Sequence, residues 1–438
     1  MRKNMISMRL ALAIGLGNII GAGIFVLSGT TIALAGSWAL LAFVFVGILA
    51  TIVALEIGEL SSIMPNAKGG AYSFAYKAFG SELGFITGIL LYFSFATSIS
   101  VVALGFGSYL SSLFGLPSYS IQVGAIALIF ALSAVNIVGI KRAAKADFGL
   151  VSTKLAILVI FIVAAVALSF YSGGFSLSNF TSGSGQAGIL PIFAASIAVF
   201  FAYSGFQTIS TFTSRVKGGS RAAAKAILLS VVISMAFYIA IVLALLMMAP
   251  ATSYSIAADP LSFALHHVGA PYWLTSVVDL GALIATASAV LAMILSSSRI
   301  AYQIGDDHLL PKPMRRYDRK RDVAVNGVVV SAAISVVMLF SGNIYVIAAI
   351  SNFGLLFSYL IASFAVIHFR KEGRNAEFRM PGYPYLTVIA ILLLFAFIIA
   401  MPQESLMIGA TMIIALLVIY YFFREVDDKK IVRIKLFR

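Results

Sequence analysis

A glycine-rich stretch near the N-terminus has the composition of a main-chain ligand site. The sequence GLGNIIGAGIF, from Gly15 to Phe25, holds four glycines within an apolar run. Because each glycine costs a helix interior about 1 kcal/mol relative to alanine, we predict an interruption of the helix here. An interrupted membrane helix leaves amides and carbonyls free for a ligand near the middle of the membrane. Close helix packing through small residues would also explain the glycines.

One basic residue, Lys154, lies inside an apolar run. It is seven residues past Asp147, which places it roughly 10 Å into a helix that rises 1.5 Å per residue. Its long stem could carry the ammonium back to the membrane surface. Alternatively, the side chain faces other helices, where a desolvated lysine titrates readily and is commonly functional.

The composition requires a helical bundle in a membrane around these residues. The 438 residues are 61% hydrophobic and 11% charged, and the mean hydropathy is +1.03. Long uncharged apolar runs of this kind are typical of integral membrane proteins. The sequence has no cysteine, and its four histidines lack metal-ligand spacing, so neither a metal nor another cofactor is expected.

Apolar runs of about 20 residues predict twelve membrane-spanning helices. The runs cover residues 8–33, 38–64, 83–110, 120–138, 148–170, 189–213, 227–249, 272–298, 323–340, 344–367, 385–401 and 406–423. Apart from Lys154, all of the 30 basic residues then fall on one side of the membrane. The positive-inside rule therefore predicts cytoplasmic termini of a multi-pass protein in the cell (plasma) membrane. The net charge of +14 reflects this topology and predicts no nucleic-acid partner.

The sixth run repeats the irregularity of the first. Its middle reads FFAYSGFQ, from Phe200 to Gln207, and Ser204-Gly205 interrupts the aromatic residues. The two irregular runs are five apart, and a repeat of five spans re-enters the membrane with opposite topology. Interrupted helices at matching places in two inverted halves indicate a transporter binding site. A channel is the main rival class, because broken helices also line pores.

Five motifs in order resemble the amino acid–polyamine–organocation superfamily of transporters. They are IGAGIF at 20–25, ELSSIMPNAKGGAYSFAYKAFG at 59–80, FFAYSGFQ at 200–207, SSRIAYQIGDDHLLPK at 297–312 and FRMPGYP at 378–384. The resemblance implies an all-α fold of twelve helices with a 5+5 inverted-repeat core and interrupted helices 1 and 6. The implied divisions are a core at 1–380 with repeats at 8–170 and 189–368, two accessory helices at 381–423, and a basic tail at 424–438.

The resemblance also implies where an amino acid would bind. Its carboxylate would meet amides around Ile20, Gly21, Ala22 and Gly23, where a half-helix N-terminus carries partial positive charge. Its amino group would meet carbonyls near Ile19 and at the helix 6 break. The residues of that break are Phe201, Ala202 and Ser204, and the candidates for reading the substrate side chain are Tyr203, Phe206, Gln207, Phe93 and Thr97. Ordinary packing is an equal interpretation of Phe93 and Thr97.

The segment STKLAIL, residues 152–158, resembles the helix 5 lysine segment of proton-coupled family members. In those members the ammonium occupies the place of a sodium ion in sodium-coupled relatives. The resemblance implies that Lys154 contacts the helix 1 carbonyl near Gly17 and a helix 8 hydroxyl, for which Ser288 is the candidate. Proton-coupled, sodium-independent transport is therefore expected.

Two departures from the family bear on substrate and gating. Many members have an acid where this chain has Gln207, and Ser214-Arg215 replace a paired acidic motif. Since no acid lies in the central parts of helices 1, 3, 6 or 10, we expect a neutral, small to medium apolar amino acid. The alternatives are an amino acid/amine exchanger and a carrier of cationic amino acids or polyamines. A nucleophile–base pair that would indicate an enzyme is absent from the predicted spans, and the protein is expected to be a monomer or a homodimer.

Three acids lie within the spans. Glu56 and Glu59 are near the cytoplasmic end of the second span, and Asp279 is about two turns inside the outer end of the eighth. A structural pair between Glu59 and loop lysines is the favoured interpretation, with a proton site as the alternative. Asp279 is either an outer-gate residue or a hydrogen-bond partner of a neighbouring helix.

Overall fold

The computed structural model describes residues 5–21, 23–67, 69–138, 143–171, 178–181, 189–256, 258–318, 321, 323–426 and 432–434. The helices of the first half are α1 (Met8–Ile19), α2 (Gly23–Ala35), η1 (Gly36–Trp38), α3 (Ala39–Ile63), α4 (Ala71–Phe79), α5 (Ser81–Phe114), α6 (Ser120–Val138), α7 (Ala143–Tyr171) and α8 (Ser178–Thr181). The later helices are α9 (Ile189–Tyr203), η3 (Phe206–Arg215), α10 (Gly219–Met248), η4 (Ala251–Ser253), α11 (Pro260–His267), α12 (Tyr272–Asp306), η5 (Lys312–Arg315), α13 (Val325–Met338), α14 (Ile344–Lys371), α15 (Tyr385–Ile399) and α16 (Gln403–Phe423).

The fold is a helical bundle with many apolar, membrane-spanning helices, as predicted. In the described part of the chain, nine helical stretches are long and apolar enough to cross a membrane, and α1, α13 and α15 are shorter apolar helices. Every predicted apolar run falls on one of these helices or on a broken pair. The span count of twelve and the inverted repeat stay predictions.

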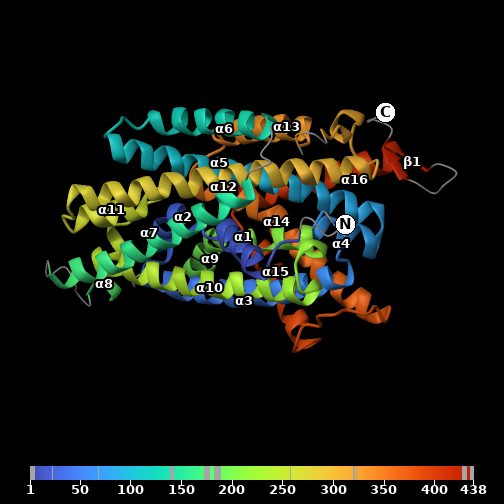
Figure 1. Cartoon of the computed structure of the whole chain (residues 1–438), viewed down its shortest axis with the longest axis horizontal. Coiled ribbons are helices and arrows are strands. Elements are labelled where there is room, and N and C mark those ends of the chain that lie inside the picture. Colours follow the sequence, from blue (N-terminus) through green and yellow to red (C-terminus); the bar gives the residue numbers. More distant parts are fainter. Residues whose placement is uncertain are drawn as a thin grey trace.

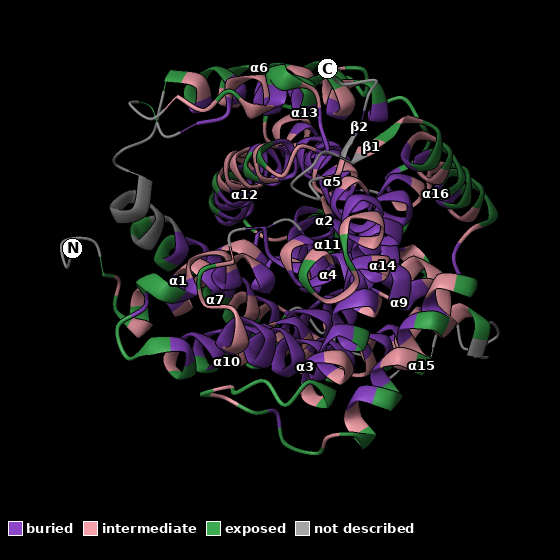
Figure 2. Ribbon diagram, turned by 90° about the vertical axis from the view of Figure 1, so that its right-hand side faces the viewer, coloured by how far each residue is buried: buried purple, intermediate pink, exposed green. Residues whose placement is uncertain are grey.

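The arrangement of the connections fits the predicted alternation of the chain. Figure 1 shows α4 and β1 at one end of the long axis and α8 and α11 at the opposite end. The central helices are mostly buried, whereas α6 and α16 at the periphery carry many exposed residues (Figure 2). Exposed apolar side chains on a peripheral helix suit contact with lipid, where burial in protein is not required.

The first predicted break is present, and it divides the glycines into two pairs. The helix α1 ends at Ile19, and α2 begins at Gly23. Gly15 and Gly17 lie within regular α1, where a Cβ would meet Ile209 and Val151 respectively. Two glycines therefore permit close helix packing, which was the alternative interpretation, and the other two coincide with the interruption.

The second predicted break is present at Ser204-Gly205. The helix α9 ends at Tyr203, and the chain continues as the 3₁₀ helix η3 from Phe206. Gly205 has a φ of 119°, which side chains with a Cβ rarely adopt. The glycine at this position therefore permits the change of direction between the two half-helices.

The short elements that lie between and after the predicted spans were not predicted, and α4 and the terminal strands are two examples. The helix α4 has only nine residues, too few to register as an apolar run. After α16 the chain forms two short antiparallel strands, β1 (Arg424–Val426) and β2 (Val432–Ile434), in the segment expected to be a tail. Neither element changes the helical class of the fold.

Candidate functional site

The two interrupted helices meet at the centre of the bundle. A Cβ on Gly23, at the start of α2, would overlap the backbone of Ala202 in α9. A Cβ on Gly205 would lie 2.8 Å from the carbonyl oxygen of Asn18 in α1. The contacts α2–α9 and α1–η3 therefore bring both breaks to one place, and both depend on glycine for their close approach.

A tyrosine of α10 connects the two breaks. The Tyr238 hydroxyl lies 2.7 Å from the carbonyl oxygen of Ile19 and 2.8 Å from that of Ala202. Its ring packs edge-on against Tyr203, whose own hydroxyl donates to the carbonyl of Phe43. Two of the carbonyls expected to meet a substrate amino group thus already face a protein donor. Each keeps a second lone pair for another donor.

Other main-chain groups at the breaks also have partners in this conformation. The Phe201 carbonyl accepts from both the amide and the hydroxyl of Ser204. The amides of Ile20 and Gly21 donate to the carbonyls of Leu16 and Ile19 at 2.7 and 3.0 Å. These two amides are therefore engaged, whereas the expectation was that they are free. Ala22, between them and α2, lies outside the described residues.

A small cavity adjoins the breaks. Its volume is about 20 Å³, which is room for about one water molecule. None of the described residues that line it is ionisable. They are Asn18, Ser94, Phe95, Ser98, Ser204, Gly205, Gln207, Thr208, Ala289, Ala292, Met293, Ser296 and Leu355. An amino acid would fit only after some of these side chains move.

Gln207 presents an unused donor at this cavity. Its Oε1 accepts from the Gly205 amide at 2.9 Å and from the Tyr359 hydroxyl at 2.7 Å. These two donors fix the orientation of the amide group. Its Nε2 has no hydrogen-bond partner in the part of the chain that the structure describes, and the residue is only 4% exposed. A buried donor without a partner is costly, so a ligand oxygen here would be favoured.

Lys154 of α7 lies beside the first break. The residue is 2% exposed, and its Nζ donates to the carbonyl of Gly17 at 3.2 Å. The side chain is thus buried among helices instead of extended to the membrane surface, and the contact implied by the resemblance is present. Ser288 donates its hydroxyl to the carbonyl of Ala285 in its own helix. Its contact with Lys154 stays a prediction.

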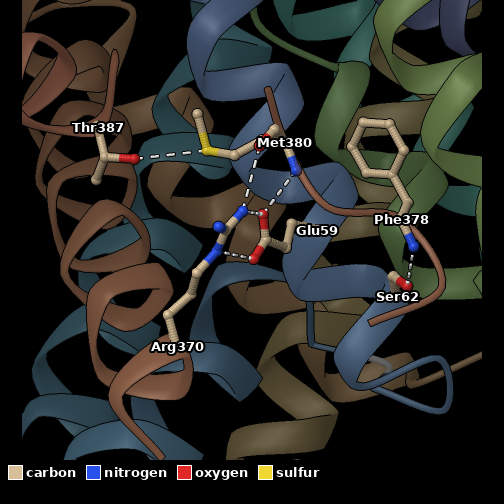
Figure 3. A network of polar contacts seen from close by, with 6 residues as sticks. All are labelled: Glu59, Ser62, Arg370, Phe378, Met380 and Thr387. Carbon is tan, nitrogen blue, oxygen red and sulfur yellow. Dashed lines mark hydrogen bonds and ion pairs between the residues drawn. The ribbon is translucent and has the colours of Figure 1, made fainter. Parts of the chain in front are cut away.

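Glu59 forms a buried ion pair with an arginine, and the expected pairing with loop lysines is wrong. Both oxygens of Glu59 accept from Arg370, at the end of α14, at 2.6 and 2.7 Å. The Met380 amide donates to the same carboxylate at 2.7 Å (Figure 3). Arginine suits this position because its planar fork binds a carboxylate with two parallel bonds. The pair anchors the segment between α14 and α15 on α3.

Removing one partner of this pair is expected to destabilise the protein. Arg370→Ala leaves the buried Glu59 carboxylate without its cationic partner, which costs about 3 kcal/mol or more. The matched control is Arg374→Ala, which breaks an exposed pair with Glu372 and should leave the melting temperature almost unchanged, because exposed ion pairs contribute little to stability. Thermal unfolding of the purified variants measures the difference. Equal melting temperatures for Arg370→Ala and Arg374→Ala would contradict this role.

The remaining intramembrane acids lie away from the breaks. Glu56 is fully buried and accepts from Ser363 at 2.6 Å through one oxygen. Asp279 of α12 is 1% exposed, and its Oδ1 has no partner among the described residues. Near the same end, Asp259 accepts from Ser108, while burial raises the pKa of Asp259 above its ordinary value. A side-chain contact with Ser262 of α11 favours the second expected role of Asp279, a hydrogen-bond partner of a neighbouring helix.

Several residues of the site were missed by the sequence analysis. Tyr238 and Tyr359 are aromatic residues within apolar runs, like many others in this chain. Asn18 and the pair Ser94 and Ser98 are polar residues in spans, and that polarity was the available signal. Of the two predicted helix 3 residues, Thr97 is fully buried, whereas Phe93 lines a different cavity that faces away from the breaks.

A bundle of apolar helices, with two interrupted helices that meet beside a buried lysine, is typical of membrane transporters. The model of the amino acid permease family matches residues 11–431, and the chain belongs to this family. It is therefore a transporter of the amino acid–polyamine–organocation superfamily, and its family is not one of enzymes.

Relatives with known names support this assignment. The chain is 28% identical to the branched-chain amino acid permease BcaP of Lactococcus lactis, with 87% of this chain and 86% of that protein covered. It is 26% identical to the methylthioribose transporter of Bacillus subtilis, with 89% and 86% covered. The solved structure of a manganese transporter from Eremococcus coleocola shares the fold, with a TM-score of 0.58, 14% identity, and 93% and 92% of the two chains covered.

Proposed function

We propose that this protein is a secondary active transporter that takes up neutral amino acids with protons and without sodium. Its core would be two inverted repeats of five spans, at 8–170 and 189–368, within twelve spans and with both termini in the cytoplasm. The meeting of the two breaks supports this proposal, because inverted-repeat transporters bind substrate between broken helices at mid-membrane. Residues 381–423 would add two accessory helices.

The chemistry of the cavity favours a substrate without a charged side chain. A desolvated cation requires a carboxylate partner, and the described cavity lining has none. Gln207 offers one neutral amide donor, and Ala289, Met293 and Leu355 offer apolar contacts. A small to medium apolar side chain suits this lining. The amino and carboxylate groups that all amino acids share would be bound by the main chain of the two breaks.

The small volume of the site indicates a closed conformation. On the side of α11, the Tyr109 hydroxyl donates to the carbonyl of Phe25 at 2.6 Å, and Ser108 donates to Asp259. These contacts join α5 to α2 and to the N-terminus of α11. Alternating access would break such contacts at one end of the bundle while forming equivalent ones at the other.

The observation that carries proton coupling is the buried contact between Lys154 and Gly17. The ammonium lies against the last turn of α1, so its charge stabilises a carbonyl beside the break. Loss of the proton would weaken this bond and loosen α7 from α1, and return of the proton would restore it. The protonation state of Nζ would thereby favour one or the other of two arrangements of α7 against the half-helix α1. No sodium ion is required.

Counterflow in proteoliposomes tests the substrate class. We expect unlabelled alanine, serine or leucine inside the vesicles to drive entry of labelled leucine, while arginine and putrescine do not. Liposomes without protein are the blank. Strong counterflow with arginine or putrescine, and none with the three neutral amino acids, would overturn the proposal in favour of a cationic substrate.

Replacing Gln207 with glutamate is expected to admit cationic substrates. The new carboxylate would lie at the cavity, and a charge-assisted hydrogen bond contributes about 1.5–3 kcal/mol, so arginine should compete about tenfold better or more. Gln207→Met is the matched control, because it removes the amide without adding a charge. It should reduce leucine uptake without any gain for arginine. If Gln207→Glu and Gln207→Met respond alike to arginine, Gln207 does not face the substrate side chain.

A further inference from the structure

A second, larger cavity opens at the periphery of the bundle. Its volume is about 710 Å³, within the range of small-molecule sites. It lies over α5, between α13 and α16, both of which pack on α5. In Figure 2, α13 lies above α5 and α16 lies to its right, both nearer the edge of the molecule than α5. The lining side chains are almost all apolar, and they include Phe85, Phe93, Val329, Met412 and Leu416.

The helices around this cavity are suited to contact with hydrocarbon. Val329 is 52% exposed although it lines the cavity, and elsewhere on α16 the apolar side chains of Ile414 and Val418 are also exposed. In a membrane such surfaces face lipid chains instead of water. An acyl chain is therefore the ligand class that the interior of the cavity favours.

The rim of the cavity is basic at one end. Pro311, Pro313 and Met314 line the cavity, and the intervening and following residues Lys312 and Arg316 are exposed. On the other side, Arg424 follows directly after α16 and stacks on Tyr421 at 5.2 Å. Two described acids lie on this side, Glu425 next to Arg424 and Glu82, which accepts a hydrogen bond from the Tyr421 hydroxyl. The basic end of the rim is therefore the one at Lys312 and Arg316.

We propose that this cavity binds one phospholipid with an anionic headgroup, drawn from the cytoplasmic leaflet. One acyl chain lies between α13 and α16, and the phosphate lies at Lys312 and Arg316. Basic residues beside pockets between membrane helices recognise anionic headgroups in this way. The proposal requires that the protein spans a membrane, but it does not depend on which substrate is transported or on proton coupling.

Native mass spectrometry of the purified full-length protein tests the chain site. Protein is incubated with equal amounts of phosphatidylglycerol and phosphatidylcholine in mixed micelles, and retained lipids are counted. Val329→Trp fills the cavity and should lower retained lipid by about fivefold or more, because the acyl chain loses apolar contact with the cavity wall. Val337→Trp is the matched control, because Val337 is 67% exposed on the same helix and outside the cavity lining. Val330→Phe is a second filling variant.

The headgroup site is tested by removing its charges. Wild type should retain phosphatidylglycerol about tenfold over phosphatidylcholine, and the double variant Lys312→Gln, Arg316→Gln should lose this preference while it still retains lipid. Lys217→Gln, Arg221→Gln removes two exposed charges elsewhere and should behave as wild type. Leucine counterflow is followed in parallel, so that a failed lipid site is distinguished from a failed transport function.

Three results would overturn the proposal. The first is equal lipid retention by Val329→Trp, Val330→Phe and Val337→Trp. The second is a headgroup preference that survives the loss of Lys312 and Arg316. The third is a wild-type dimer without bound lipid that Val329→Trp dissociates, since a second copy of the chain would then occupy the cavity.

Discussion

Replacement of Lys154 with alanine is expected to reduce proton-driven uptake strongly and leave the protein folded. The variant loses a buried, charge-assisted bond to the Gly17 carbonyl, which contributes about 1.5–3 kcal/mol. Uptake driven by an inward proton gradient should fall by about tenfold to 100-fold, because 1.4 kcal/mol is a factor of ten. The measurement is initial leucine uptake into proteoliposomes at several internal and external pH values.

The conservative variant separates titration from packing. Lys154→Arg keeps a positive charge that does not titrate near neutral pH, so exchange of substrate should persist while pH dependence is lost. Lys225→Ala, which removes an exposed lysine of α10, is the control for loss of charge. A Lys154→Ala protein that is still driven normally by pH would show that Lys154 only packs α7 against α1.

Replacement of Gly23 with valine is expected to eliminate transport. A Cβ here would overlap the Ala202 backbone, which cannot yield as a flexible side chain would. The two breaks would then be forced apart, and uptake should fall by about 100-fold or more, because a clash with backbone exceeds the about 1–3 kcal/mol of ordinary overpacking. Gly149→Val is the control, because nothing lies within 4 Å of a Cβ at that glycine. Gly23→Val that is folded and fully active would exclude the α1–α2 break as the substrate site.

A smaller substitution at the same break, Gly21→Ala, is expected to be compensated by a second substitution on the facing helix. A Cβ on Gly21 would lie 3.0 Å from the Cβ of Ala289 in α12, so Gly21→Ala should slow uptake. Ala289→Gly removes the opposing methyl group and should restore much of the rate in the double variant. Non-additivity of this kind is expected only for residues in contact. A double variant no better than Gly21→Ala would contradict the observed packing.

The breaks were predictable because their causes are local. Glycine disfavours a helix interior wherever it occurs, so the first and sixth apolar runs could be recognised without knowledge of their neighbours. Whether a given glycine would lie in a break or in a regular helix was not predictable. Gly15 and Gly17 lie in regular helix, and Ile209 and Val151 of other helices occupy the space where their Cβ atoms would lie. These contacts are set by tertiary packing.

The partners of the polar groups were not predictable from the sequence. Tyr238 bonds carbonyls 219 and 36 residues away, and Gln207 bonds Tyr359 across 152 residues. No local pattern relates residues so distant in the chain. For Glu59, the sequence indicated a basic partner near the end of its span, but the choice of Arg370 depends on how α14 ends beside α3. The depth of Lys154 left two interpretations, and the position of α7 against α1 distinguishes them.

Accumulation of labelled leucine in proteoliposomes with imposed ion gradients tests the central claim most directly. The same preparation is measured with an inward proton gradient in sodium-free buffer, with an inward sodium gradient at equal pH, and with neither. We predict accumulation with the proton gradient alone and no stimulation by sodium. Accumulation that requires sodium, or that ignores the proton gradient, would contradict the account of Lys154 as the coupling residue.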